Sequence, residues 1–480
     1  MSANATVARW EARRLRDAVT KLVDGSHNPP PKQGDGRPML SARNVDNGQI
    51  NFGEYRLISN DAFATEHART RVAPGDVLLT IVGTIGRSAV VPEGHEPFAL
   101  QRSVAVLTAN DDLLPKFLAY QLQSPKVQRH FESHARGTAQ KGVYLKTLGD
   151  TPILVPPVSV QTNIIAEIEK QFSRLDEAVA NLKRVKANLK RYKAAMLKAA
   201  VEGRLVPTEA ELAKREGRAY ETGTELLERI LDTRRSKRNG TGDYTRPDWT
   251  ETVRPPQLPE GWSTCGIDQI VSAGRDALKT GPFGTLLKKH EHRSSGVPVL
   301  GIENICSMRF IRKTKISITF EKARQLNDYA AQPGDVLVSR SGTVGEVCVV
   351  PNDLGEARIS TNLLRVRLAS NGMLPEFLVL LFNGSPFVLD QVAQLCKGST
   401  RDFLNQGILK RLSFVVPPLA EQHRIVAEVD RRLSIVREVE SEVDANLKRA
   451  QALRQAVLAR AFALPGSTCA GQSEHVLTPA

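Results

Sequence analysis

Two long stretches of the chain carry apolar residues at steps of three and four, which is the spacing of one face of an α-helix. The first runs from about Gln161 to Glu202 without proline or glycine, and the second from about Glu421 to Phe462. The apolar positions are Ile168, Phe172, Leu175, Val179, Leu182, Val185, Leu189, Tyr192 and Met196 in the first, and Val429, Leu433, Val436, Val439, Val443, Leu447, Ala450, Leu453 and Val457 in the second. At 1.5 Å per residue, each stretch predicts a helix of roughly 60 Å. Each stripe is too apolar to face water, so we expect the two helices to pair antiparallel as a coiled coil.

The two halves of the chain repeat one another at an offset of about 260 residues. The matching segments keep the same order: Pro74–Leu78 with Pro333–Leu337, Gly83–Gly86 with Gly342–Gly345, Leu114–Leu118 with Leu374–Leu378, and Val155–Pro157 with Val416–Pro418. Two copies at so long a period indicate a duplicated domain pair, because a solenoid needs shorter and more numerous repeats. In each copy, short β-branched runs broken by glycine, proline and asparagine precede the helical stretch. This pattern predicts a compact α+β or mostly β domain of roughly 150 residues.

Composition limits the class of protein. Hydrophobic residues make up 41% and charged residues 25% of the chain, which excludes wholesale disorder and a fibrous repeat. The longest apolar run, Phe377–Phe382, has six residues, whereas a membrane span needs about 20. Because the first residues also lack the hydrophobic segment of a secretory signal, we expect a cytoplasmic protein. The five cysteines show no CxxC spacing, so free thiols are expected in place of disulfides or zinc.

The chain is basic. Its 66 lysine and arginine residues minus its 52 acidic residues give a net charge of +14, and the sequence pI is about 9.6. Such an excess favours a polyanionic partner, of which nucleic acid is the first candidate. The charge alone leaves this open, because many basic proteins bind no DNA. The segment Lys183–Lys198 holds seven basic residues and no acidic one, which fits a solvated helix face as well as a stripe that faces phosphates or an acidic partner.

Several motifs together resemble one family. They are Gly334–Gly345 (GDVLVSRSGTVG), Val415–Gln422 (VVPPLAEQ), a long helix ending at Leu453–Phe462, Leu258–Trp262 (LPEGW) and Gly281–Gly284 (GPFG). With these motifs in this order over about 460 residues, the sequence resembles the specificity subunit of a type I restriction–modification system. The first half departs from the pattern twice: Val158–Gln161 stands where the second half has Leu419–Gln422, and Trp10 lacks the Leu-Pro-x-Gly lead-in.

The resemblance implies the α+β class, with two duplicated α/β target-recognition domains separated by two long antiparallel helices that form a coiled coil. The implied layout is target-recognition domain 1 at 1–157, spacer helix 1 at 158–203, a connector at 204–257, target-recognition domain 2 at 258–417, spacer helix 2 at 418–464 and a disordered tail at 465–480. Within the connector we expect a short helix around Thr224–Leu231 and a flexible basic segment around Arg234–Arg238.

The resemblance also implies a non-catalytic DNA-recognition subunit. Two similar but unlike domains on a stiff helical spacer would read the two halves of a bipartite, asymmetric site in double-stranded DNA. Two modification subunits would assemble on the chain and restriction subunits would join them. The chain itself would bind no cofactor or metal, because S-adenosylmethionine, ATP and Mg would be used by the other subunits. Two alternatives stay open: a self-sufficient DNA methyltransferase or nuclease, and a coiled-coil adaptor that binds protein only.

Base edges are read by side chains with paired hydrogen-bond donors and acceptors on elements that reach a groove. The DNA-contacting candidates are Arg43, Asn44, Arg87, Gln101, Arg102, Lys141 and Tyr144 in the first domain, and Lys288, Lys289, Asn304, Arg340, Asn362, Lys397 and Arg401 in the second. No catalytic or metal-ligating spacing accompanies them. Asn28–Pro31 begins like the tetrapeptide of amino-methyltransferases, but Pro31 replaces the aromatic residue that would stack on a flipped base. The two Gly-Asp-Val-Leu segments predict turns into a core strand and not phosphate cradles.

Overall fold

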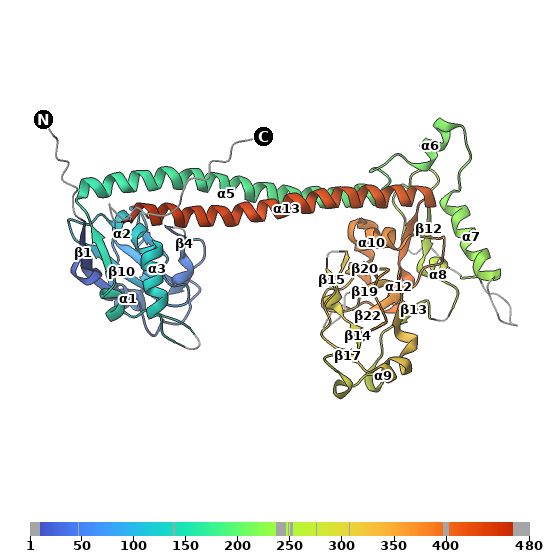
Figure 1. Cartoon of the computed structure of the whole chain (residues 1–480), viewed down its shortest axis with the longest axis horizontal. Coiled ribbons are helices and arrows are strands. Elements are labelled where there is room, and N and C mark those ends of the chain that lie inside the picture. The colour runs from blue at the N-terminus through green and yellow to red at the C-terminus, as the bar shows by residue number, and fades with distance from the viewer. Residues whose placement is uncertain are drawn as a thin grey trace, which may run out of the picture. The chain divides into compact units, whose positions relative to one another are not determined.

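The computed structural model describes residues 10–46, 48–137, 140–236, 246–247, 249, 253–274, 276–306, 308–396 and 403–463. It divides into two compact units, whose elements are labelled in Figure 1. Unit 1 is Met1–Arg184 with Val443–Ala480, and unit 2 is Val185–Glu442. Unit 1 is therefore assembled from two segments that lie far apart in the sequence.

Unit 1 is built around a four-stranded antiparallel sheet in the order β2-β10-β7-β8. Its strands are β2 (Val19–Asp24), β7 (Val77–Thr80), β8 (Ser88–Val90) and β10 (Val104–Ala109). A second sheet, β6-β3-β9, consists of β3 (Arg37–Leu40), β6 (Arg56–Ile58) and β9 (Ala99–Leu100). Two short ladders are β1 (Glu11–Arg14) with β11 (Pro152–Val155), and β4 (Val45–Asp46) with β5 (Gln49–Ile50). The short helices are η1 (Leu15–Asp17), η2 (Ala42–Asn44), α1 (Asn60–Thr70), α2 (Pro115–Leu122), α3 (Pro125–His134) and α4 (Leu145–Gly149).

Unit 2 repeats this plan with a four-stranded sheet in the order β13-β22-β19-β20. Its strands are β13 (Leu278–Thr280), β19 (Val336–Ser339), β20 (Val347–Val349) and β22 (Leu363–Val366). The second sheet, β17-β14-β21-β18, consists of β14 (Val297–Leu300), β17 (Ser317–Ile318), β18 (Ala330–Ala331) and β21 (Ala357–Ile359). The ladders are β12 (Ser263–Gly266) with β23 (Ser413–Val416), and β15 (Ile305–Cys306) with β16 (Arg309–Phe310). The short helices of this domain are α8 (Ile267–Ile270), η3 (Gly284–Leu286), η4 (Lys289–Glu291), η5 (Ile302–Asn304), α9 (Phe320–Gln325), η6 (Asn327–Tyr329), α10 (Pro375–Gly384), α11 (Pro386–Leu395) and α12 (Gln406–Arg411).

The strand orders of the two units correspond one to one, apart from the added edge strand β18. In both, the second sheet contains one parallel pair: β3 with β9 in unit 1, and β14 with β21 in unit 2. The duplication and the α+β class that the sequence predicts are therefore confirmed.

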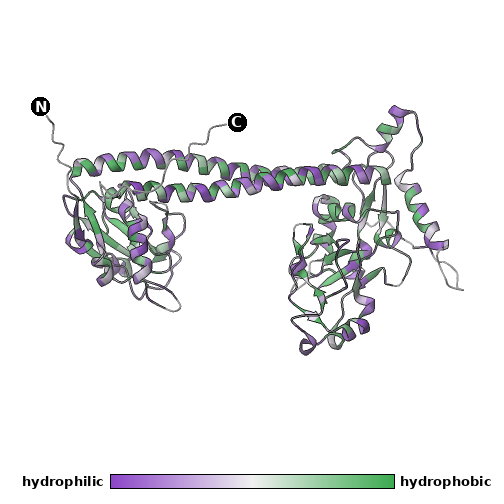
Figure 2. Cartoon of the chain, in the orientation of Figure 1, coloured by the Kyte–Doolittle hydropathy of each residue, from purple (hydrophilic) through white to green (hydrophobic). Residues whose placement is uncertain are grey.

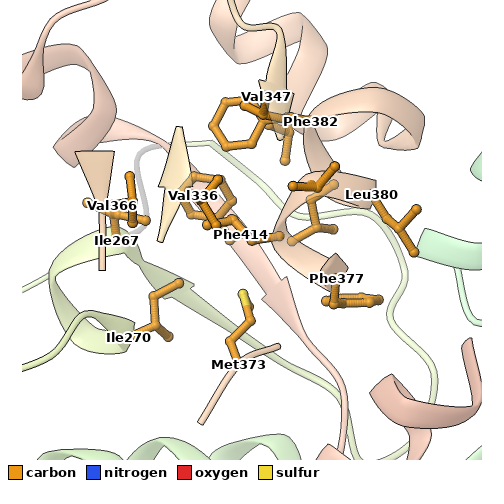
Figure 3. Packing of buried hydrophobic residues seen from close by; sticks show 14 of the residues in the cluster. Ile267, Ile270, Val336, Val347, Val366, Met373, Phe377, Leu380, Phe382 and Phe414 are labelled. Atoms are coloured by element: carbon orange, nitrogen blue, oxygen red, sulfur yellow. The ribbon is translucent and has the colours of Figure 1, made fainter. Parts of the chain in front are cut away.

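The central strands of each four-stranded sheet are buried on both faces. In β7, Val77 and Leu79 enter the core beneath α2, while Leu78 enters a second core under β3 and β9. In β19, Val336 shares a core with Phe377 and Phe414 (Figure 3). Val338 belongs to the same core, while Leu337 belongs to the core on the opposite face. Because both faces are covered, these strands carry apolar residues at consecutive positions, as in Val77–Leu79 and Val336–Val338, instead of alternating. Figure 2 shows hydrophobic residues gathered on the strands of each domain.

The predicted turns before these strands are also present. Gly75 and Gly334 have φ of 88° and 80°, a backbone region that favours glycine. The carboxylate of Asp76 accepts a hydrogen bond from Ala73 N at 2.8 Å, and that of Asp335 accepts one from Gln332 N at 2.7 Å. Each buried aspartate therefore closes the turn that leads into a core strand.

Two long helices complete the units: α5 (Val158–Val201) and α13 (Leu419–Ala461). In unit 1, Arg454 binds Asp176 at 2.8 Å and lies 3.8 Å from the ring centroid of Phe172, while Leu458 and Phe462 share a core with Phe172 and Ile168. Residues later in α5 therefore lie beside residues earlier in α13, so the two helices run antiparallel in this unit.

Unit 2 shows the same direction. Arg432 of α13 interacts with Tyr192 of α5, and Val429 and Ile425 share the core with Met196 and Ala200. The predicted antiparallel pairing of the long helices is thus confirmed within each unit.

Four of the apolar residues expected on the two stripes are exposed. The exposed fractions are 40% for Val185, 44% for Tyr192, 36% for Val439 and 54% for Leu453. Three residues advance an α-helix by about 300°, which is about 60° short of a full turn. Two successive spacings of three residues therefore rotate the apolar stripe by about 120° around the helix axis. Each of these residues follows such a phase break, at 182–185 or 436–439. The sequence shows these phase breaks and therefore excludes a perfect heptad, and the exposed side chains lie at or beyond the breaks.

The connector contains more structure than the sequence predicts. Helix α6 spans Glu209–Glu216, and α7 spans Gly223–Ser236, which is longer than the expected Thr224–Leu231. Leu226, Leu227, Ile230 and Leu231 of α7 are buried in unit 2. The basic segment begins at the end of α7, and its remainder lies outside the described residues, as does the predicted tail.

The described residues contain no single helix that is both long and apolar enough to cross a membrane. The bent pair α10 and α11 meets a length and composition criterion only when taken together, and Phe377, Leu381 and Val388 of this pair are buried in the core of unit 2.

Candidate nucleic-acid interface

Three chain segments meet where strand β7 of the four-stranded sheet in unit 1 ends and strand β10 begins, and this end of the sheet is called its edge below. Ile81, which follows β7, donates its N–H to Ser103 O at 2.9 Å and accepts a hydrogen bond from Val143 N at 2.9 Å. The following turn reverses the chain at Gly83 and Gly86, whose φ values are 81° and 89°. This edge therefore joins the turn after β7, the start of β10 and the segment before α4.

The same arrangement is built in unit 2. Arg340, which follows β19, donates its N–H to Asn362 O at 3.0 Å and accepts a hydrogen bond from Leu404 N at 3.0 Å. The two glycines of the next turn both have φ of 82°. Arg340 therefore holds the backbone position that Ile81 holds in unit 1.

Unit 1 has two open clefts beside this edge. The first, of about 740 Å³, is lined by residues that include Arg43, Arg87, Gln101 and Arg102. The second, of about 1330 Å³, shares Arg43 and Gln101 with the first. Four of the seven residues predicted for this domain therefore come together, and they supply three guanidinium groups and one amide.

The other predicted residues of unit 1 differ in their surroundings. Lys141 and Tyr144 are exposed, and Gly83 N donates to Lys141 O at 3.1 Å, so Lys141 borders the same edge. Arg87 lies 3.5 Å from the carboxylate of Asp46. A partly exposed pair of this kind is weakly held, which leaves the guanidinium of Arg87 able to exchange its partner.

Asn44 and Asn304 have a structural role that the sequence does not reveal. Both side chains are buried. The amide of Asn44 accepts from Ser41 N and donates to Asn51 O and Glu54 O, at 2.7 to 2.9 Å. Asn304 makes the matching bonds to Gly301 N, Ile311 O and Lys313 O, at 2.8 to 2.9 Å. These bonds use both N–H groups of each amide, so neither side chain has a free donor for a base edge.

In unit 2, Lys288 and Lys289 are exposed around η4, and Asn362 is exposed at the start of β22. Arg340 is 4% exposed and lies between the rings of Phe283 and Phe403. Burial lowers the pKa of Arg340. Lys397 and Arg401 lie outside the described residues.

Sequence reasoning missed several residues at these edges. Lys32, Arg56 and Tyr55 line the larger cleft of unit 1, and they follow no motif that would identify them. Phe283 and Phe403 are 51% and 40% exposed beside Arg340. The GPFG segment was recognisable as a motif, but its contact with an arginine far along the chain depends on the fold.

A buried polar cluster in unit 2 is related to one departure of the first half from the family pattern, the replacement of Leu419–Gln422 by Val158–Gln161. Trp262 Nε1 donates to the Glu421 carboxylate at 3.0 Å, and Glu209 N donates to the other oxygen at 2.8 Å. Burial raises the pKa of Glu421. In the first half, Val160 stands at the position of Glu421. The first half therefore cannot form the bond that joins Trp262 to Glu421, because Val160 has no carboxylate to accept it.

We expect Trp262→Phe to destabilise unit 2 by about 1–3 kcal/mol, because a buried carboxylate oxygen loses its donor. The loss should be larger at neutral pH than near pH 4, since the raised pKa of Glu421 means that folding favours its protonated form, and protonation removes the unpaired charge. Chemical unfolding at the two pH values measures this. Trp10→Phe is the matched control, and an equal loss in both variants would contradict the role of the Trp262–Glu421 contact.

Comparison with known proteins agrees with this geometry. The family described as "Type I restriction modification DNA specificity domain" matches residues 24–191 and 259–445. The type I restriction enzyme EcoBI specificity subunit of Escherichia coli is 23% identical over 386 residues, which cover 80% of this chain and 72% of that protein. The StySPI specificity subunit of Salmonella potsdam is 20% identical over 438 residues, which cover 90% and 82%.

A solved structure of a type I restriction–modification system, concerned with its complex assembly and conformational transition, contains a chain with the same fold. That chain has a TM-score of 0.60 and 19% identity, and the match covers 95% of this chain and 97% of that chain. The two matched segments coincide with the two repeated domains and the starts of the long helices. The chain therefore belongs to the type I restriction–modification DNA specificity family and carries the family's domain twice.

Proposed function

We propose that the chain reads a bipartite, asymmetric DNA site, with one half-site for each repeated domain. The observation that carries this proposal is that one backbone scaffold is built twice with different side chains at the same edge. Unit 1 has Ile81 beside an open cleft that contains three arginines, and unit 2 has Arg340 between two phenylalanine rings. Unlike edges on a shared scaffold favour two unlike half-sites.

The spacing between half-sites is proposed to depend on α5. This helix runs from Val158 to Val201 and passes from unit 1 into unit 2. It contains no proline or glycine, so neither of the usual causes of a kink is present. Half-sites read from one side of a duplex lie about one helical turn, roughly 34 Å, apart.

We further propose that two modification subunits and the restriction subunits assemble on this chain. In each unit, one copy of the repeated domain packs against a segment of α5 and a segment of α13. Each unit can thus offer a similar surface to one copy of the modification subunit. Methyl transfer with S-adenosylmethionine, and cleavage with ATP and Mg, would belong to those partners.

The chain is proposed to contribute no reacting group of its own. Pro29 lines the smaller cleft of unit 1, but Pro31 takes the place of the aromatic residue that base flipping would need. Incubation of the purified chain alone with DNA and a labelled methyl donor should give no transfer. Transfer by the chain alone would instead support a self-sufficient methyltransferase.

Methylation-sensitive sequencing of DNA modified by the complex tests the DNA-reading function directly. A split asymmetric motif is expected, and its absence would count against the proposal. Binding by the complex should also fall by about 1000-fold or more between 50 and 200 mM salt, if six or more lysines and arginines displace counterions from phosphates. Binding that is indifferent to both sequence and salt would favour a protein-only adaptor.

A further inference from the structure

The side chain of Arg340 is held rigidly at the edge of unit 2. Its guanidinium carbon lies 4.9 Å from the ring centroid of Phe283 and 4.4 Å from that of Phe403. Nε donates to Leu404 O at 3.2 Å, and Nη1 donates to Thr361 O at 2.8 Å. Two aromatic rings and two backbone carbonyls thus fix the plane of the guanidinium group.

The charge of Arg340 is not neutralised by the part of the chain that the structure describes. Arg358 and Arg365, the other buried arginines of unit 2, have carboxylate partners: Glu356 at 2.7 Å and Asp276 at 3.2 Å. For Arg340, no described carboxylate lies within ion-pair distance, and Nη2 has no described hydrogen-bond partner and is not enclosed. A positive charge with free donors is therefore oriented in advance between two exposed rings.

The fold itself does not require this group. Ile81 holds the equivalent backbone position in unit 1. The N–H group of Gly25 donates to β10, and that of Gly281 donates to β22, each at 3.1 Å. When the two domains are aligned on these bonds, His27 of unit 1 occupies the position of Phe283 in unit 2. Unit 1 therefore forms the same backbone arrangement with Ile81 in place of Arg340 and His27 in place of Phe283, so the shared scaffold does not depend on this pair of side chains.

We propose that Arg340 reads a guanine in the half-site of the second domain, with Phe283 and Phe403 as positioning residues that hold its guanidinium plane. This inference rests on the proposed DNA-reading function. Guanine offers O6 and N7 as paired acceptors in the major groove, and a bidentate arginine is their commonest partner. The free hydrogens on Nη1 and Nη2 match that pair, and a guanidinium group whose plane is already fixed loses little conformational entropy on binding.

The test compares the methylation motif of the wild-type complex with those of Arg340→Ile and Arg340→Met. The first variant introduces the residue that unit 1 carries, and the second keeps an unbranched chain that fits between two rings. We expect the preference for guanine at one position of the second half-site to fall by roughly 10- to 100-fold, with the first half-site unchanged. Arg324→Gln removes an exposed charge from α9 of the same unit and should leave the motif as it is.

Phe403→Ala gives a readout that a purely structural arginine would not produce. Arg340 stays present in this variant but loses one of its two rings, so the preference for guanine should weaken at the same position. A wild-type motif without guanine in the second half-site would overturn the inference, as would unchanged motifs in the Arg340 variants. Failure of both Arg340 variants to assemble would show that the fold needs the arginine and would overturn it equally. If the wild-type complex yields no split motif at all, the proposed function fails first.

Discussion

Replacement of residues 256–415 by the matching segment of a relative will change the second half-site completely and leave the first half-site as it is. The segment contains the four-stranded sheet, its second sheet and the edge around Arg340, whereas α5 and α13 lie outside it. If the two domains read DNA independently, only one half of the motif can respond. Methylation-sensitive sequencing of DNA modified by the chimera measures both halves in one experiment.

The structure sets three requirements for the donor segment. Trp262 must be kept, because it donates to the buried Glu421 outside the segment. Gly384 must stay glycine, since a Cβ there would lie 2.6 Å from Leu197 O of α5. Position 372 must carry glycine or another small residue, because a Cβ there would lie 2.9 Å from the end of the Ile230 side chain in α7. A chimera that meets these requirements tests recognition and not misfolding.

The reciprocal replacement of the first domain is the matched control and should alter the first half-site alone. A change in both half-sites by either chimera would contradict independent reading. An unchanged motif in both chimeras would show that the repeated domains do not determine the sequence that is recognised.

Gln161→Ala will destabilise unit 1 by about 2–4 kcal/mol. The side chain of Gln161 is fully buried, accepts from Leu114 N at 2.8 Å and donates to Asp112 O and Pro156 O at 2.7 and 2.8 Å. Its removal leaves one buried and two partly buried backbone groups without this partner. A buried group left unsatisfied costs about 1–3 kcal/mol, and a partly buried group costs less because water can reach it. The loss is a large share of a typical domain's total stability of about 5–15 kcal/mol.

Gln422 performs the same task in unit 2, where it accepts from Leu374 N at 2.9 Å and donates to Pro417 O at 2.9 Å. Gln422→Ala should therefore destabilise unit 2 and leave unit 1 near its original stability. Denaturant unfolding followed by a probe in each unit measures the two effects. Thr162→Ala, at an exposed position in the first turn of α5, is the control. Losses below about 1 kcal/mol in both glutamine variants would contradict the argument that buried backbone groups need these amides.

The features that depend on local order along the chain were predictable from the sequence. The absence of proline and glycine from Gln161 to Glu202 predicts α5, and the repeated Pro-Gly-Asp segments predict the turns at Gly75 and Gly334. Proline, glycine and helical periodicity act through backbone geometry within a few residues, so their effect does not depend on the rest of the fold. The same reasoning explains why the duplication was visible as matching turns and strands.

The features that depend on distant partners were not predictable. Asn44 and Asn304 have the chemistry of base-reading residues, but the fold brings backbone groups to them that use their hydrogen-bonding capacity. The chemistry of a side chain determines which groups it can bind, whereas its neighbours in the fold determine which of its hydrogen-bonding groups stay free for a ligand.

The way unit 1 is completed has a consequence for synthesis on the ribosome. Arg454 and its partner Asp176 are 278 positions apart, and Leu458 and Phe462 fill the core beside Phe117. At a translation rate of about 5–20 residues per second, the first domain is made roughly 14 to 56 s before those side chains exist. Its apolar surface at Phe117 and Phe172 therefore has to remain uncovered during that interval, which makes the nascent first domain a natural client for chaperones.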